Sequence, residues 1–208
     1  GITLTGRVKI DTIVAQGCKP IGKPLRVTKC DRNLLKEIDG SPPFKILENL
    51  YSTLNEEDRK LFQHSLFIGM VMDPFNDVPT MGDFLIRNVI GTDKEKNIIA
   101  IGEFLSEGQV IQFHLRDSKA SSENLRNLLT STSYSELPLD ECGAILFSCL
   151  GRGSYLFGKP DHDTDMFKQY VGDIPLTGFF CNGEIGPVDG NTYIHGYTSS
   201  FGIIRPDK

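Results

Sequence analysis

The chain has 208 residues, of which 39% are hydrophobic and 24% charged, and its formal net charge is −5 at pH 7. This length and composition predict an ordinary soluble globular domain whose core is large enough to need no disulfide or metal support. The acidic balance and the lack of any Lys/Arg cluster argue against nucleic acid and anionic membrane surfaces as partners.

In chain order, alternating or continuous apolar runs rich in β-branched residues predict strands. These strands cover residues 8–15, 25–28, 34–38, 65–72, 84–89, 98–101, 110–116, 143–148, 174–180, 184–188, 193–195 and 197–204. The four between 65 and 116 have mostly short connections, so we expect an antiparallel meander. Residues 16–24 are expected to be a stiff loop with two glycines and two prolines, and 189–191 a tight turn.

Helical spacing of apolar residues predicts helices at about 42–53, from Asn55 onwards, at 117–130 and at 162–170. Ser41 is expected to cap the first of them. Because the strands outnumber the helices and connect closely, we predict an α+β fold. In this fold helices pack on a largely antiparallel, or mixed, sheet in a single compact domain over 1–208, with its core at about 8–205.

The cysteines are an odd number, lie far apart and form no C-x-x-C pair: Cys18, Cys30, Cys142, Cys149 and Cys181. Free thiols in a reducing compartment are the simplest interpretation, which predicts a cytoplasmic location. No apolar run approaches the ~20 residues of a membrane span, and no signal peptide opens the chain. We therefore expect no membrane partner.

The strand predicted at 143–148 runs into a glycine-framed turn, Cys149-Leu150-Gly151-Arg152-Gly153. Glycine permits positive φ, so the backbone N–H groups of Gly151 and Gly153 are expected to form an anion-binding nest. The Arg152 guanidinium adds a fork suited to a carboxylate or phosphate. A tight turn with a solvent-facing arginine explains the same residues without a ligand.

A second glycine-framed turn, Cys181-Asn182-Gly183-Glu184, follows the strand predicted at 174–180. Asn182-Gly183 is a hairpin signal, which leaves the Cys181 thiol and the Glu184 carboxylate to be explained. We predict that Asn182 and Glu184 contact a ligand amine or amide. If the two strands are neighbours, both thiols reach one pocket rim. The predicted ligand-binding set is Cys149, Gly151, Arg152, Gly153, Cys181, Asn182, Gly183 and Glu184.

Other chemistry of the two thiols has weaker support. A nucleophilic cysteine needs a base, for which His162 and His195 are candidates, yet free cysteine usually packs as a small hydrophobe. A metal site from Cys149, Cys181 and a histidine is an alternative, but the spacings match no zinc pattern. We assign no catalytic and no metal-binding residue, and favour a non-enzymatic function.

Three blocks, at 147–153, 175–187 and 195–198, resemble the C-terminal half of the FIST domain family. Blocks at 17–22 and 82–88 are also similar, so the resemblance covers about residues 8–205, with 178–187 as its specific part. The resemblance implies that the N-terminal half of a complete member lies outside this chain. It also implies that this half, or a signalling protein, is a partner.

Members of this family occur beside output domains in bacterial signalling proteins and in eukaryotic F-box proteins of ubiquitin ligases. The resemblance therefore implies a cytoplasmic sensory module, with a small anionic or zwitterionic metabolite such as an amino acid as the leading ligand hypothesis. Some bacterial members are similar to haem-based gas sensors, so a haem-binding sensor with a His or Cys ligand is one alternative. A protein-interaction adaptor is the other.

Overall fold

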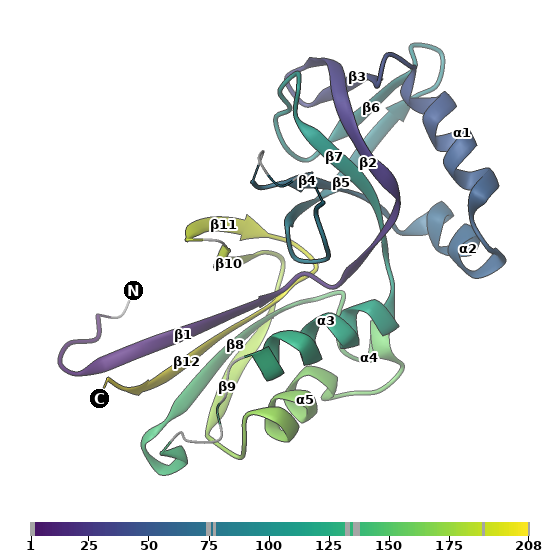
Figure 1. Ribbon diagram of the computed structural model, residues 1–208. Helices are drawn as coiled ribbons and strands as arrows, with labels where there is room; N and C mark the ends of the chain where they lie inside the picture. Colours follow the sequence, from purple (N-terminus) through teal and green to yellow (C-terminus); the bar gives the residue numbers. More distant parts are fainter. Residues whose placement is uncertain are drawn as a thin grey trace. The chain divides into compact units, whose positions relative to one another are not determined.

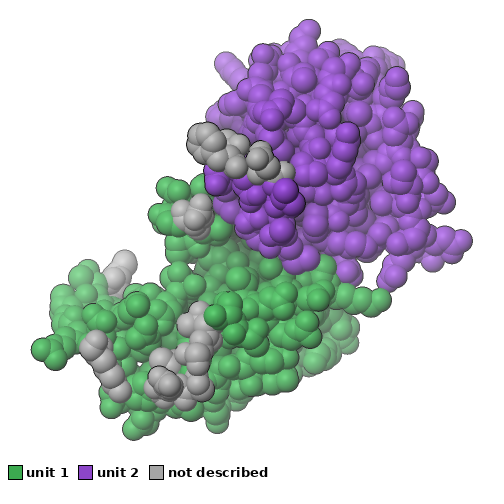
Figure 2. Space-filling view, in the orientation of Figure 1, with its two compact units in different colours: residues 1–17, 118–208 green, residues 18–117 purple. Residues whose placement is uncertain are grey.

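The structure is a computed structural model that describes residues 3–73, 76, 78–131, 134, 138–188 and 190–207. The chain divides into two compact units, residues 1–17 with 118–208 (unit 1) and residues 18–117 (unit 2), coloured in Figure 2. Both contain helices and mostly antiparallel strands, which confirms the predicted α+β class. The prediction of one domain over 1–208 stays a prediction, since two compact units can belong to one domain or to two.

Unit 1 contains a four-stranded sheet in the order β1-β12-β8-β9 and a separate hairpin of β10 and β11. Its elements are β1 (Val8–Ala15), α3 (Ser118–Ser131), η1 (Leu139–Glu141), β8 (Gly143–Cys149), α4 (Ser154–Phe157), α5 (His162–Tyr170), β9 (Leu176–Cys181), β10 (Glu184–Val188), β11 (Asn191–His195) and β12 (Ser199–Pro206). Strand β12 is antiparallel to β1 and β8, whereas β9 is parallel to β8. Helices α3 and α5 lie side by side in this unit (Figure 1).

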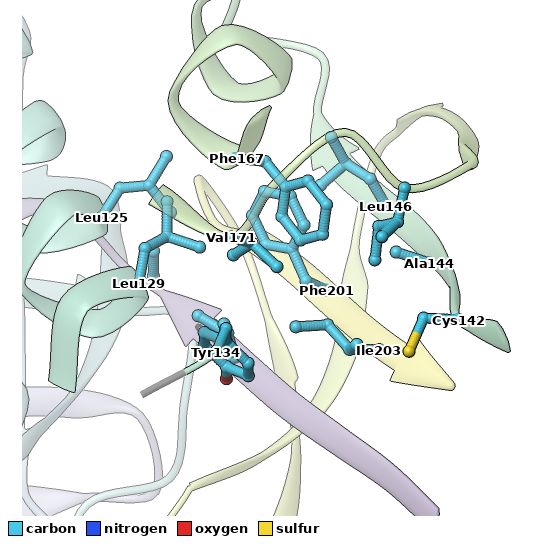
Figure 3. Packing of buried hydrophobic residues seen from close by; sticks show 13 residues of the cluster. Leu125, Leu129, Tyr134, Cys142, Ala144, Leu146, Phe167, Val171, Phe201 and Ile203 are labelled. Carbon is cyan, nitrogen blue, oxygen red and sulfur yellow. The ribbon is translucent and has the colours of Figure 1, made fainter. Parts of the chain in front are cut away.

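Apolar side chains from α3, α5 and the four-stranded sheet form the core of unit 1 (Figure 3). Phe167 of α5 stacks on Phe201 of β12, with their ring centroids 5.2 Å apart. Both residues are buried, and burying each such side chain stabilises the fold by about 1.5–3 kcal/mol. This packing fixes α5 against the sheet and so positions the residues at the start of the helix.

Unit 2 closes six strands into a barrel in the order β2-β3-β6-β5-β4-β7. Its elements are β2 (Cys18–Asp31), β3 (Leu34–Ile38), α1 (Pro43–Thr53), α2 (Glu56–His64), β4 (Leu66–Val71), β5 (Phe84–Asp93), β6 (Ile98–Ile101) and β7 (Val110–Arg116). The predicted meander is correct for β4, β5 and β6 but wrong for β7, which pairs with β4 and β2. Closure pairs the backbone groups that a meander leaves exposed at its edges.

Two local predictions in unit 2 are also wrong. Residues 18–24, expected to be a loop, begin β2, whose register shifts around Gly22. Gly22 has a φ of 64°, and its carbonyl accepts a hydrogen bond from Gln112 Nε2 at 2.8 Å, so the irregular step keeps its backbone paired. Ser41 does not cap α1: the cap position is Pro42, without a side-chain hydrogen bond, and Ser41 instead pairs its backbone with β3.

Several local predictions are confirmed. Helix α5 spans the predicted residues 162–170, and Asn55 caps α2 by accepting a hydrogen bond from the Asp58 N–H at 2.8 Å. Strands β10 and β11 pair as a hairpin, although Asp189 of the predicted turn lies outside the described residues. The strands that carry the two glycine-framed turns, β8 and β9, are neighbours, as the idea of a shared rim requires.

Candidate ligand-binding site

The chain turns sharply after β8, and the turn brings Arg152 into the interior of unit 1. The Arg152 N–H donates to the Cys149 carbonyl at 2.9 Å, and Gly153 follows with a φ of 68°. Positive φ favours glycine, and a Cβ at Gly153 would also meet the Phe180 ring at 3.1 Å. As a result Arg152 is 2% exposed, so it is not the solvent-facing arginine of an ordinary turn.

Arg152 forms a bidentate ion pair with Asp163 in the first turn of α5. Its Nε donates to Asp163 Oδ2 at 2.7 Å and its Nη2 donates to Oδ1 at 2.9 Å. Asp163 also accepts hydrogen bonds from Ser148 Oγ of β8, at 3.3 Å, and from Ser199 Oγ of β12. One buried carboxylate thus connects the end of β8, the start of β12 and α5.

Asp163 is ionised although it is buried. Burial alone would raise the pKa of this carboxyl, but hydrogen bonds from His162 and Arg152, the Arg152 charge and the Ser199 hydroxyl hold the pKa well below its usual range. The carboxylate is therefore a permanent hydrogen-bond acceptor at neutral pH. It fixes the plane of the Arg152 guanidinium through two of that group's nitrogen atoms.

His162 extends the network from α5 to α3 and α4. Its Nδ1 lies 2.9 Å from Asp163 Oδ1, and its Nε2 lies 2.8 Å from Ser122 Oγ of α3. The imidazole stacks on the Phe157 ring of α4, with centroids 3.5 Å apart and an interplanar angle of 6°. The Arg152 guanidinium carbon is 5.2 Å from the centroid of the same Phe157 ring. Arg152 and His162 therefore share one aromatic neighbour.

The order Ser122, His162, Asp163 resembles a catalytic triad, in which histidine takes the proton of a nucleophilic hydroxyl. Here the Ser122 hydroxyl donates to the Ser118 carbonyl at 2.9 Å inside α3. Ser122 is also absent from the residues that line the neighbouring cavity, and Asp163 is shared with Arg152. The three side chains therefore lack the arrangement of an activated serine nucleophile.

A cavity of about 680 Å³ lies beside this network within unit 1. Its polar lining includes Ser148, Arg152, His162 and Asp163. Further polar lining residues are Ser154, Asp161, Thr164 and Thr177, and the apolar ones include Leu146, Leu150, Tyr155, Leu176 and Phe180. Phe180 is 54% exposed, so a ligand has apolar surface to cover. A volume of this size with both apolar surface and fixed polar groups is typical of small-molecule sites.

One hydrogen-bond donor of the polar lining has no acceptor. Asp163 engages Nε and Nη2 of Arg152, whereas Nη1 is buried and none of the described residues accepts a hydrogen bond from it. An unsatisfied buried donor costs about 1–3 kcal/mol, and an acceptor that binds from outside the protein removes that cost. Arg152 therefore keeps one buried N–H group that has no acceptor among the described residues, in a residue that lines the cavity.

The two predicted thiols lie in a separate cluster, on paired positions of β8 and β9. Cys149 is opposite Cys181 in the parallel register. The Cys181 thiol donates to Glu184 Oε1 at 3.5 Å, and Glu184 Oε2 accepts from the Thr198 backbone N–H at 3.3 Å. Burial, followed by the nearby Glu184 carboxylate, raises the pKa of the Cys181 thiol. The thiol is therefore protonated at neutral pH, which makes it a poor nucleophile.

Two family models match the chain: the FIST N domain over residues 1–41 and the FIST C domain over residues 43–187. The chain belongs to the FIST family. FIST domains are in general sensory signal-transduction domains. The expectation that the N-terminal half lies wholly outside this chain is wrong, because residues 1–41 match the FIST N model.

Among the relatives, the uncharacterized protein Rv0628c of Mycobacterium tuberculosis is 40% identical over 203 residues, which are 98% of this chain and 52% of that protein. The uncharacterized protein Mb0898c of Mycobacterium bovis is 39% identical over 207 residues, which are 100% of this chain and 53% of that protein. F-box only protein 22 of Homo sapiens is 38% identical over 132 residues, which are 59% of this chain and 33% of that protein. The FIST chain thus spans about half the length of the mycobacterial relatives.

The structure divides the predicted ligand-binding set of this FIST chain. Arg152 and Gly153 line the cavity. The remaining members do not: Cys149, Cys181 and Glu184 form the thiol cluster, Gly151 is half-buried in the turn after β8, and Asn182 and Gly183 are exposed between β9 and β10. Their contact with a ligand stays a prediction.

Sequence reasoning missed Asp163 as the partner of Arg152, and it considered His162 only as a base for a thiol. The available signal was Asp161-His162-Asp163 at the start of a predicted helix. An arginine that follows directly on a buried strand needs a carboxylate if it is buried, since an unpaired buried charge is strongly destabilising. Asp163 lies 11 residues beyond Arg152, close enough for a short loop to bring the two together.

The cavity of this FIST chain does not fit haem. An axial ligand must offer the iron a free lone pair. His162, the histidine among the described lining residues, has both ring nitrogens engaged by Asp163 and Ser122. Neither Cys149 nor Cys181 lines the cavity. The described residues therefore supply no His or Cys axial ligand there, which disfavours the haem alternative as it was predicted.

In the described part of the chain, no group of three or more His, Cys, Asp or Glu side chains is placed so that it could hold a metal ion. The helices of this part are too short or too polar to cross a membrane.

Proposed function

We propose that this chain is a cytoplasmic sensory module that binds a small anionic or zwitterionic metabolite, such as an amino acid, in the Arg152 cavity. The observation that carries the proposal is the Arg152 Nη1 donor, which is buried beside the cavity without an acceptor among the described residues. Membership of the FIST family supports the sensory role. The free cysteines support the cytoplasmic location.

The ligand carboxylate accepts a hydrogen bond from Arg152 Nη1. Asp163 holds Nε and Nη2, so the guanidinium keeps its orientation while the ligand displaces the atoms that cover Nη1. Such preorganisation improves affinity, since no side-chain rotation has to be frozen on binding. Gly153 also lines the cavity and has no side chain to obstruct the approach of the ligand to the turn.

A zwitterionic ligand also needs an acceptor for its amine, and Asp161 is the exposed carboxylate among the lining residues. The Asp161 side chain does not cap α5, and the residue is held at a φ of 57°, which is uncommon for a residue other than glycine. Phe180 covers the apolar part of the ligand. The amine-binding role predicted for Asn182 and Glu184 stays a prediction, because neither lines this cavity.

A thermal-shift screen of the standard amino acids and small carboxylates, followed by calorimetry of each hit, tests the proposal. Arg152→Lys keeps a cation for Asp163 but lacks Nη1. A hydrogen bond to a charged group is worth about 1.5–3 kcal/mol, so we expect this variant to bind about 10- to 150-fold more weakly. Arg126→Lys, an exposed change on α3, is the matched control and should bind normally.

Two results would contradict the assignment. One is a screen in which no compound stabilises the wild-type chain. The other is a compound from the screen that binds Arg152→Lys and the wild type with equal affinity, when the two proteins unfold at similar temperatures.

A further inference from the structure

We propose that the cavity selects carboxylates with an aromatic side chain, and that His162 takes up a proton when such a ligand binds. The inference rests on the proposed function, since it concerns the same cavity. It adds two points to that function: the chemical class of the ligand, and His162 as the group whose positive charge balances the ligand carboxylate.

The charges around the cavity show why a proton is needed. Its described lining carries one permanent cation, Arg152, and two carboxylates, Asp161 and Asp163. With His162 neutral, the lining therefore has a net charge of −1, which opposes the entry of an anion. Protonation of His162 brings that net charge to zero, so an anionic ligand favours the protonated ring.

The hydrogen-bond partners around His162 suit both the neutral and the protonated ring. Asp163 is ionised and can only accept, so Nδ1 donates to it in either state. The Ser122 hydroxyl has one proton and lies 2.8 Å from His162 Nε2 and 2.9 Å from the Ser118 carbonyl oxygen. Beside a neutral ring the hydroxyl donates to Nε2. When Nε2 gains a proton it donates to the hydroxyl, which then turns to donate to the Ser118 carbonyl.

The groups that face His162 come from several elements. Asp163 of α5 is its anionic partner, and Ser122 of α3 and Phe157 of α4 are neutral. From the turn after β8, Arg152 faces it through the shared Asp163 carboxylate. A ligand carboxylate at Arg152 Nη1 adds negative charge beside this group and so favours the imidazolium. By reciprocity, protonation of His162 strengthens ligand binding.

The apolar lining argues for an aromatic ligand side chain. Phe180 of β9 lines the cavity with its ring beside Gly153, and it is more than half exposed. Successive side chains of a strand point to opposite faces, so the Phe179 ring lies on the other face of β9, against Phe147 at 5.3 Å between centroids. Aromatic rings prefer edge-to-face and offset contacts with another ring, and a cavity of about 680 Å³ has room for one.

Calorimetry with three probes of one shape tests both parts: 3-phenylpropanoate (anion), L-phenylalanine (zwitterion) and 3-phenylpropanamide (neutral). Titration at pH 7 in two buffers of different ionisation enthalpy measures the protons taken up. We expect both carboxylates to bind with uptake of up to one proton and the amide at least about tenfold more weakly without uptake. As the pH is raised above 7, carboxylate affinity should fall by up to about tenfold per pH unit. L-Alanine should bind more weakly than L-phenylalanine.

The variant His162→Gln should bind the carboxylates with no proton uptake and no pH dependence. The control His64→Gln, an exposed change at the end of α2, should keep both. Nitrogen-15 NMR of the histidine rings gives a check that does not depend on a variant's folding. In the carboxylate-bound wild type, one ring should show both nitrogens protonated at pH 7.

The outcomes separate the inference from the function on which it rests. Failure of both carboxylates to bind overturns the proposed function and the inference together. Carboxylate binding without proton uptake, uptake that persists in His162→Gln, or equal affinity for L-alanine and L-phenylalanine overturns the inference alone.

Discussion

Replacing Asp163 with asparagine tests whether the buried ion pair holds unit 1 together. The carboxylate accepts hydrogen bonds from the side chains of Arg152, His162, Ser148 and Ser199. Asparagine has the same shape but no charge, so the buried Arg152 guanidinium loses its counter-ion. Removing one partner of a buried pair costs about 3–5 kcal/mol. A domain is stable by about 5–15 kcal/mol, so we expect a large part of that stability to be lost.

Thermal unfolding at pH 7 measures the effect. For a chain of this size 1 kcal/mol shifts the melting temperature by about 2–4 °C, so Asp163→Asn should melt about 6–20 °C below wild type. The control Asp165→Asn changes an exposed carboxylate in the same helical turn. It loses only a helix-dipole interaction of less than about 1 kcal/mol. A loss of under about 1 kcal/mol in Asp163→Asn would refute the argument.

The pH dependence of stability gives a second check on the same residue. Folding lowers the pKa of Asp163, so its contribution is fully present above the unfolded pKa of about 3.9. It is lost as the pH falls towards the folded pKa. The difference in unfolding free energy between wild type and Asp163→Asn should therefore vary by less than about 1 kcal/mol from pH 5 to pH 7. It should shrink below about pH 4.

Three further predictions concern other parts of the chain. Gly178→Ala should destabilise unit 1 by about 3 kcal/mol or more in urea unfolding, because its Cβ would lie 1.8 Å from a β8 carbonyl oxygen. The control Gly143→Ala, whose nearest contact is 3.9 Å away, should change little. Cys181 should react slowly with iodoacetamide at pH 8, and Glu184→Gln should speed the reaction, because the carboxylate helps to raise the thiol pKa. His114, whose pKa is lowered by burial to about 4, should stay neutral by NMR down to about pH 5, and its contribution to stability should fall by about 3 kcal/mol as the pH drops from 6.5 to below 4. A normal titration of His114 near pH 6.5 would contradict the last of these.

Local features of the fold were predictable from the sequence because short-range physics decides them. The helix at 162–170 follows from its apolar spacing, and the β10–β11 hairpin follows from turn residues between two apolar runs. The start of β2 was not predictable from residues 18–24, because Gly22 and the nearby prolines are typical of a loop. A register shift and the Gln112 side chain, 90 residues away, let the strand continue there.

The candidate site was predictable only in part, for a similar reason. Arg152 was identified from its turn, but its burial depends on the positions of α5 and β12, which local sequence does not determine. The carboxylate that holds it comes from Asp163, and the hydroxyl on the far side of His162 comes from Ser122, 40 residues earlier. The place of Phe180 in the lining becomes evident only when β9 is placed parallel to β8, which puts Phe180 beside Ser148.

This network differs from a purely structural ion pair because only one of its two partners has all its hydrogen-bonding groups paired. Asp163 accepts hydrogen bonds on both oxygens, whereas Arg152 retains a buried donor without an acceptor among the described residues. A pair selected for stability alone would satisfy both partners, because an unsatisfied donor costs free energy that better packing would recover. A ligand that supplies the missing acceptor stabilises Arg152, Asp163 and His162 together. Since His162 contacts Ser122, we expect a ligand bound in the cavity to stabilise α3 as well as α5.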